Sequence, residues 1–118
     1  MKTEIWVTHS YGGWNISFAK TFELPFTPFP GLVIQDNKGD DMNSIRLDNS
    51  DYVRSTIYFD VENNNFEINV NEYWKRPISD ETIDETIQIF TSTGWKRKDS
   101  TNIKELKELM KREHERGR

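Results

Sequence analysis

The chain has 118 residues, no cysteine and a formal net charge of −4. This length is typical of one domain, and the lack of cysteine excludes disulfides, thiolate metal sites and cysteine nucleophiles. Leu, Ile, Val and Phe form about 24% of the residues, above the level of roughly 20% below which disorder is favoured, so we expect one folded domain over residues 1–118.

The first 20 residues alternate between apolar and polar side chains, which is typical of two half-buried strands. The segment SYGG between them contains glycines that can adopt the positive φ angles of a tight hairpin turn. A turn centred on Tyr11 and Gly12 predicts one continuous apolar face. The predicted pairs on that face are His9 with Trp14, Val7 with Ile16 and Ile5 with Phe18.

The stretch FELPFTPFPGL, residues 22–32, places three phenylalanines and three prolines in an otherwise polar chain. The strand alternation continues into it, and the prolines then require an extended segment with few hydrogen bonds before Gly31. We therefore predict a strand that runs into a proline corner. The alternative interpretation is a recognition motif in which Phe26 and Phe29 are exposed to a partner.

Two further hairpins are predicted. GLVIQD and NSIRLD pair around a loop at Gly39, with Ile34 opposite Ile45 and Leu32 opposite Leu47. Residues 51–74 form a second hairpin whose turn is centred on Asn63 and Asn64, because asparagine tolerates the left-handed conformation. The predicted pairs of this hairpin are Val61 with Phe66, Phe59 with Ile68 and Ile57 with Val70.

After residue 76 the apolar period changes from that of a strand to that of a helix. Ser79 is the predicted cap of the first helix, with a hydrophobic staple between Ile78 and Ile83. Gly94 and Trp95 predict a Schellman motif at its end, in which Trp95 meets Phe90. The segment WKRK can add a short strand. DSTN then caps a last helix with an apolar stripe, formed by Ile103, Leu106 and Met110.

These elements predict an α+β fold with an antiparallel sheet of about six strands, followed by two C-terminal helices packed on one face. Residues 1–76 form the β-rich part, and residues 77–118 form the helical part, whose basic tail frays from about residue 112. The sequence does not decide which face of the sheet the helices cover.

No recognisable catalytic or metal-binding pattern is present in the sequence. The acidic run 36–51 departs from the EF-hand loop, because its sixth and twelfth positions are Asp41 and Leu47 instead of glycine and glutamate. A solvated turn is the favoured interpretation of this run, and a weak cation site is the alternative. We predict a non-enzymatic protein with no catalytic residue, no metal and no cofactor; a pocket near His9, Tyr11 and Trp14 is left open.

The charge distribution suggests two kinds of partner. Residues 1–94 carry a balance of −8 and residues 95–118 a balance of +4. The first hypothesis is a binding module whose acidic, aromatic sheet surface meets another protein, of basic character; the predicted partner-binding residues are Trp6, Phe26, Phe29, Tyr58 and Tyr73.

The alternative is nucleic-acid binding through residues 95–118, where positive side chains can follow a phosphate backbone and an aromatic ring can stack on bases. The residues that would carry it are Trp95, Lys96, Arg97, Lys98, Lys104, Lys107 and Lys111. No segment approaches the roughly 20 apolar residues that span a bilayer, and the N-terminal residues do not resemble a signal peptide. We therefore expect a cytoplasmic protein that does not contact membranes.

Overall fold

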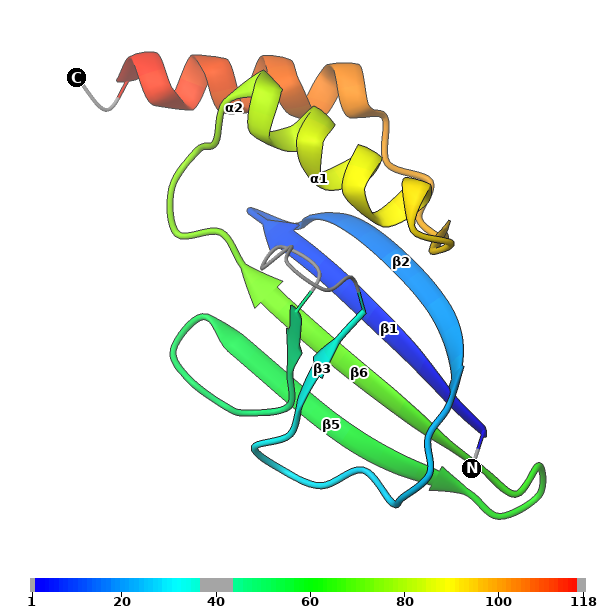
Figure 1. Ribbon diagram of the computed structural model, residues 1–118. Coiled ribbons are helices and arrows are strands. Elements are labelled where there is room, and N and C mark those ends of the chain that lie inside the picture. The colour runs from blue at the N-terminus through cyan, green and yellow to red at the C-terminus, as the bar shows by residue number, and fades with distance from the viewer. Residues whose placement is uncertain (1, 37–43, 117–118) are drawn as a thin grey trace.

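The computed structural model describes residues 2–36 and 44–116, which form an α+β structure (Figure 1). The main sheet contains five strands: β1 (Lys2–Tyr11), β2 (Trp14–Glu23), β5 (Val53–Asp60), β6 (Asn65–Tyr73) and β7 (Lys96–Arg97). A separate two-stranded sheet contains β3 (Val33–Gln35) and β4 (Ser44–Arg46). The helices are α1 (Asp80–Ser92) and α2 (Ile103–Arg116).

The main sheet is mixed, so the prediction of an antiparallel sheet of about six strands was wrong. Its strand order is β5-β6-β1-β2-β7, and the central pair, β1 and β6, is parallel. Thr3 of β1 pairs with Phe66 of β6, 63 residues further along the chain. Hairpins leave turn residues that can be recognised in a sequence, whereas this long-range pair has no local signal. The two predicted strands around Ile34 and Ile45 exist, but they form the separate small sheet.

The register of the first hairpin differs from the prediction by two residues. Its turn consists of Gly12 and Gly13, with φ angles of 52° and 87°, so Tyr11 pairs with Trp14. A two-residue turn of this kind requires positive φ at both central positions, and two glycines meet that requirement better than Tyr11 and Gly12. The observed pairs are His9 with Ile16, Val7 with Phe18 and Ile5 with Lys20. The predicted apolar face survives, because a shift of two residues keeps each side chain on its face.

The hairpin of β5 and β6 shows the same kind of shift. Its loop spans residues 61–64 instead of two asparagines, and Asp60 pairs with Asn65. The Asp60 carboxylate accepts hydrogen bonds from the backbone N–H groups of Glu62 and Asn63, at 3.1 and 3.2 Å, and from the Asn63 side chain, at 2.7 Å. The bonds from Asn63 lower the pKa of Asp60. The observed pairs are Phe59 with Phe66, Ile57 with Ile68 and Ser55 with Val70.

The predicted pairing of Ile34 with Ile45 is confirmed. The Leu47 N–H donates to the Leu32 carbonyl at 2.9 Å, which continues the same register beyond the strands. The loop predicted around Gly39, and with it much of the acidic run 36–51, lies outside the described residues.

Both predicted ends of α1 are confirmed. The Ser79 hydroxyl accepts a hydrogen bond from the Thr82 N–H, which caps the first turn. At the other end Gly94 has a φ of 92°, and the Trp95 N–H donates to the Phe90 carbonyl at 3.1 Å, as a Schellman motif requires. The Trp95 and Phe90 rings meet edge to face, with centroids 5.2 Å apart.

The predicted short strand β7 and the last helix are also present. Asn102 caps α2 by accepting a hydrogen bond from the Glu105 N–H at 3.2 Å. Leu106 and Met110 are each 1% exposed, and α2 continues to Arg116.

One buried cluster joins both sheets and both helices. Its central contact is a stacked pair, Phe18 of β2 and Phe90 of α1, with centroids 4.6 Å apart. The cluster consists of Ile5, Val7, Ile16, Phe18, Ile45, Leu47, Ile68, Val70, Ile83, Phe90, Trp95, Leu106 and Met110.

The stretch at 22–32 is a corner, as predicted. β2 ends at Glu23, and no helix or strand follows until β3. The Phe22 ring packs edge-on against Trp95, whereas Phe26 and Phe29 are 45% and 50% exposed and contact each other, with centroids 6.2 Å apart. The corner therefore combines one structural ring with an exposed aromatic pair.

Candidate protein-binding surface

The outer face of the main sheet is the face opposite the buried cluster. In β1 the odd residues from Thr3 to His9 are buried, so the even residues and their partners on neighbouring strands lie on the outer face. Its residues are Glu4, Trp6, Thr8, Ser10, Asn15, Ser17, Ala19, Thr21, Arg54, Thr56, Tyr58, Glu67, Asn69, Asn71 and Tyr73.

Three of the predicted partner-binding residues lie on this face. Trp6 is half-buried on the central strand, and its indole N–H donates to the Glu4 carboxylate. Tyr58 and Tyr73, on β5 and β6, are 49% and 46% exposed. Tyr58 lies in the row next to that of Trp6, whereas Tyr73 pairs with Ser10 towards the other end of the sheet. The other two predicted residues belong to the exposed pair at the proline corner.

Glu4 and Glu67 are the functional candidates that the sequence did not reveal. They lie directly opposite each other, because β1 pairs in parallel with β6. Like charges in directly opposite positions destabilise a sheet, and within residues 2–36 and 44–116 neither carboxylate is in a salt bridge with a cation. Tyr58 completes the row beside Glu67, and Trp6 follows Glu4 on the same strand. The result is an acidic and aromatic site, which we call the Glu4–Glu67 site.

The other end of the outer face is polar and internally hydrogen-bonded. The hydroxyls of Thr8 and Ser17 lie 3.0 Å apart, and the Ser10 hydroxyl donates to the Asn15 side chain at 2.7 Å. A cavity of about 430 Å³ opens here; its lining includes Thr8, Ser10, Tyr11, Asn15, Asn71 and Tyr73. This end carries hydroxyl and amide groups and one cation, Arg54, which pairs with Asn71, in contrast to the acidic Glu4–Glu67 site.

His9 lies in the core. It is 6% exposed, and its ring centroid lies 5.3 Å from that of Trp74 and 5.6 Å from that of Phe90. Its Nε2 atom is 3.1 Å from a carboxylate oxygen of Glu72, and this hydrogen bond lowers the pKa of Glu72. Its Nδ1 atom is buried and has no hydrogen-bond partner in the described part of the chain.

Tyr11 and Trp14 pair across the first hairpin but do not form one pocket with His9. The Tyr11 hydroxyl donates to the Glu113 carboxylate of α2, and this hydrogen bond raises the pKa of Tyr11 to about 12. Tyr11 lines the cavity of the outer face and Trp14 lines another, while His9 lines neither. The hairpin end therefore offers no shared site for these three side chains.

Several residues of the basic alternative have structural partners. Trp95 is 3% exposed, and its indole N–H donates to Asp36 at 2.8 Å, so its ring is enclosed in the core. The Asp36 carboxylate also pairs with Lys20 at 3.0 Å. Lys107 pairs with Asp84 on α1 at 2.7 Å. The exposed members of the set are Lys96, Lys98, Lys104 and Lys111.

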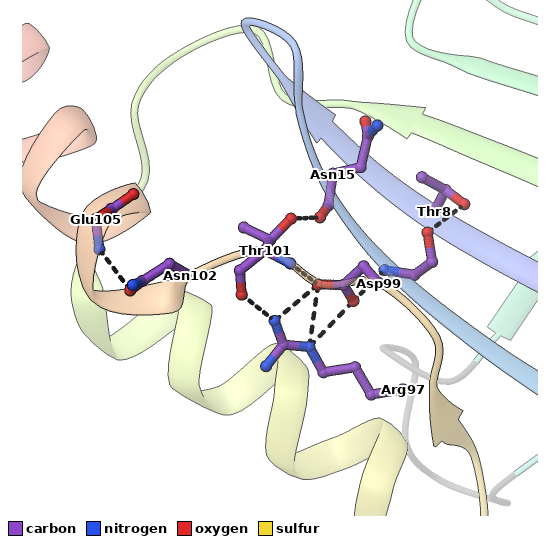
Figure 2. Close-up of polar contacts among 8 residues, drawn as sticks. Thr8, Asn15, Arg97, Asp99, Thr101, Asn102 and Glu105 are labelled. Atoms are coloured by element: carbon purple, nitrogen blue, oxygen red, sulfur yellow. Dashed lines mark hydrogen bonds and ion pairs between the residues drawn. The ribbon is translucent and has the colours of Figure 1, made fainter.

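Arg97 belongs to a network centred on Asp99 (Figure 2). The Asp99 side chain is 7% exposed and accepts hydrogen bonds from the Arg97 guanidinium, the shortest at 2.7 Å. It also accepts from the backbone N–H groups of Ser17, at 2.9 Å, and Thr101, at 3.0 Å. The carboxylate thereby joins β2, β7 and the start of α2, and this gives Arg97 a structural role.

The described residues contain no group of His, Asp and Glu side chains that could hold a metal ion. In the same residues, no helix is long and apolar enough to cross a bilayer. A comparison of the chain with models of protein families, with curated proteins and with solved structures finds no match.

Proposed function

We propose that the protein is a non-enzymatic cytoplasmic binding module that holds a basic segment of a partner protein on the outer face of its sheet. Both helices would pack on the core-facing side and leave the outer face open. The observation that carries the proposal is the Glu4–Glu67 site, in which two glutamates occupy directly opposite positions on β1 and β6, next to Trp6 and Tyr58.

A lysine or arginine side chain fits this site for two reasons. It would relieve the repulsion between Glu4 and Glu67, and it could lie over the face of Tyr58 or Trp6. Exposed cation–π contacts contribute about 0.5–1 kcal/mol, and exposed ion pairs about 0.2–1 kcal/mol. Because each contact is weak, a partner would need several of them, and the exposed pair Phe26 and Phe29 is a second contact region for the same partner.

The test compares capture of partners from native lysate by three tagged proteins, after nuclease treatment. The first is the wild type, the second is Glu4→Gln with Glu67→Gln, and the third is the matched control Glu108→Gln with Glu115→Gln, which removes the same charge from exposed positions of α2. We expect one protein to bind the wild type and the control but not the second variant. Equal capture by all three would refute the proposal.

Stability gives an independent measure of the same site. If Glu4 and Glu67 repel each other, Glu67→Gln raises the free energy of unfolding by a few tenths of a kcal/mol while it weakens partner binding. Urea denaturation of the wild type and the variant measures this gain. A loss of stability would show that the two carboxylates support the fold instead of a partner.

Nucleic-acid binding is the second candidate. It is favoured by Lys96 and Lys98, which are exposed and line a cavity of about 420 Å³ together with Lys20; Glu4 lines the same cavity and reduces its positive charge. Binding through these side chains would decrease steeply as salt rises. Replacing Lys96 and Lys98 by glutamine should then abolish capture of RNA or DNA, and capture that is unaffected by salt would exclude this candidate.

A further inference from the structure

The polar end of the outer face brings side chains from three strands into two short rows. The pairing of β6 with β1 and of β1 with β2 sets these rows, and neighbouring strands lie about 4.8 Å apart, so each row is about 10 Å long. The first row is Asn71, Thr8 and Ser17, and the second is Tyr73, Ser10 and Asn15. All of them except Ser17 line the cavity of about 430 Å³, a volume within the range of small-molecule sites.

Two amide side chains at this cavity keep hydrogen-bonding groups available. The Asn15 side-chain oxygen accepts from Ser10, which leaves the NH₂ group of Asn15 free to donate. Within residues 2–36 and 44–116, the Asn71 side chain and the Tyr73 hydroxyl have no hydrogen-bond partner. Because an amide has both a donor and an acceptor, Asn71 can bind a group that itself donates and accepts.

The lining of the cavity is uncharged and includes aromatic rings. Tyr11 and Trp74 complete the lining, and none of the residues that form it is Asp, Glu, Lys or Arg. The cavities beside Lys98 and beside Lys111, in contrast, are lined by charged side chains. Arg54 lies opposite Asn71 on β5 but is not part of this lining. A neutral ligand therefore fits this cavity better than a phosphate or a carboxylate.

We propose that this cavity binds a neutral sugar ring, stacked on Tyr73 and hydrogen-bonded to Asn71 and Asn15. The C–H groups of a sugar ring suit the negative face of an aromatic ring, and Tyr73 is exposed. Each sugar hydroxyl donates and accepts one or more hydrogen bonds, which matches the two amides. The inference concerns a small ligand and stands independently of the protein partner proposed for the Glu4–Glu67 site.

The hairpin turn leaves this cavity accessible. Gly12 and Gly13 belong to the lining and carry no side chain, and no heavy atom of another residue lies within 4 Å of the position that a Cβ atom would take on either glycine. A ligand can therefore approach from the turn without displacing a side chain. The site is shallow and its contacts are few, so we expect a dissociation constant of about 1–10 mM for a single sugar ring.

Heteronuclear NMR of the wild-type chain tests the proposal with defined probes. The probes are glucose, its epimers mannose and galactose, and N-acetylglucosamine, each added to about 50 mM, which exceeds the expected dissociation constant. We expect at least one sugar to shift the backbone amide signals of Gly12, Gly13 and Asn71 in a saturable manner, and to leave the signal of Glu67 unchanged. Absence of saturable shifts with all four sugars would overturn the proposal.

Variants of exposed tyrosines separate ring stacking from a general effect on the surface. Tyr73→Ala should weaken sugar binding about tenfold, whereas Tyr73→Phe, which keeps the ring, should retain most of it. The matched control is Tyr58→Ala, because Tyr58 is about equally exposed on the same face but lies outside the cavity. The dispersion of the NMR spectrum shows whether each variant is folded. Equal losses for Tyr73→Ala and Tyr58→Ala would contradict the assigned position.

Two further arms distinguish this site from other ligands and from the proposed protein partner. Uridine and adenosine are neutral and can stack on tyrosine, so saturable shifts with these nucleosides but with no sugar would overturn the ligand class. Asn71→Ala should weaken sugar binding about three- to tenfold through the lost hydrogen bonds. Glu4→Gln with Glu67→Gln should leave sugar binding unchanged while it abolishes capture of the protein partner, and a loss of sugar binding in this variant would refute the separation of the two sites.

Discussion

The replacement Asp99→Asn tests how much the network around Asp99 contributes to stability. The substitution keeps the shape of the side chain but removes its charge and one acceptor oxygen. The new amide group would then face donors, namely the Arg97 guanidinium or the Thr101 N–H. A buried donor without an acceptor costs the full desolvation penalty of its group, so the variant loses more than one hydrogen bond.

Breaking a buried ion pair costs about 3–5 kcal/mol, and the Arg97 side chain, at 30% exposure, recovers part of this by solvation. We therefore expect Asp99→Asn to lower the free energy of unfolding by about 2–3 kcal/mol. In a domain of this size the melting temperature would fall by about 8–12 °C. The matched control is Asp84→Asn, which breaks the pair with Lys107 at a carboxylate that is 61% exposed, and it should cost less than about 1 kcal/mol.

Urea denaturation at several pH values distinguishes this explanation from a simple packing defect. Burial alone would raise the pKa of Asp99, but hydrogen bonds from Arg97 and from the backbone of Ser17 and Thr101 outweigh it and lower the pKa below its ordinary value of 3.8. The negative charge of Asp99 therefore stabilises the fold fully above pH 3.8, and this contribution to stability is lost as the pH falls through the lower pKa of the native state. The difference in the free energy of unfolding between the wild type and Asp99→Asn should therefore become smaller in that acidic range. If Asp99→Asn lowers the free energy of unfolding at neutral pH by no more than Asp84→Asn does, the reasoning is refuted.

Three further predictions concern the C-terminal end of α1 and two ionisable side chains, Tyr11 and Glu72. Gly94→Ala should lower the free energy of unfolding by about 1 kcal/mol, because alanine is strained at a φ of 92°, and unchanged denaturation would contradict this. Absorbance after a pH jump should show Tyr11 ionising near pH 12, and Glu113→Gln should bring its pKa back towards 10. Glu72→Gln should cost less than about 1 kcal/mol, since Glu72 is 41% exposed. Because the bond to His9 lowers the pKa of Glu72, this cost should be present above pH 4.5 and disappear on acidification; a cost that persists at low pH would point to packing.

The parts of the fold that depend on neighbouring residues could be predicted from the sequence. The cap at Ser79, the Schellman motif at Gly94 and the apolar face of each hairpin all follow from spacings of a few residues. The two registers were predicted wrongly although their signals are local: Gly13 stands beside Gly12 in the first turn, and the Asp60 side chain binds the backbone two and three residues later in the second. A shift of two residues leaves the apolar pattern unchanged, so the pattern does not distinguish the two registers.

The candidate site was less accessible to sequence analysis. The alternation places Trp6, Thr8 and Tyr58 on the face opposite the apolar one, but the neighbourhood of Glu4 and Glu67 depends on the parallel pairing of β1 with β6. Trp95 was considered for base stacking because it precedes three basic residues, whereas its distant partners Phe22 and Asp36 place it in the core. In both cases the deciding contacts come from residues far apart in the chain.

The parallel pairing of β1 with β6 also has a consequence for the order in which the protein folds during synthesis. β1 leaves the ribosome before β6, so the edge of β1 that pairs with β6 stays unpaired until residues 65–73 have been made. Closing a connection of 63 residues costs about 2 kcal/mol more in chain entropy than closing a hairpin loop of four. The two hairpins should therefore form early and independently, and their docking should limit the rate of folding. Until then the nascent chain carries an open β1 edge that is exposed to other chains.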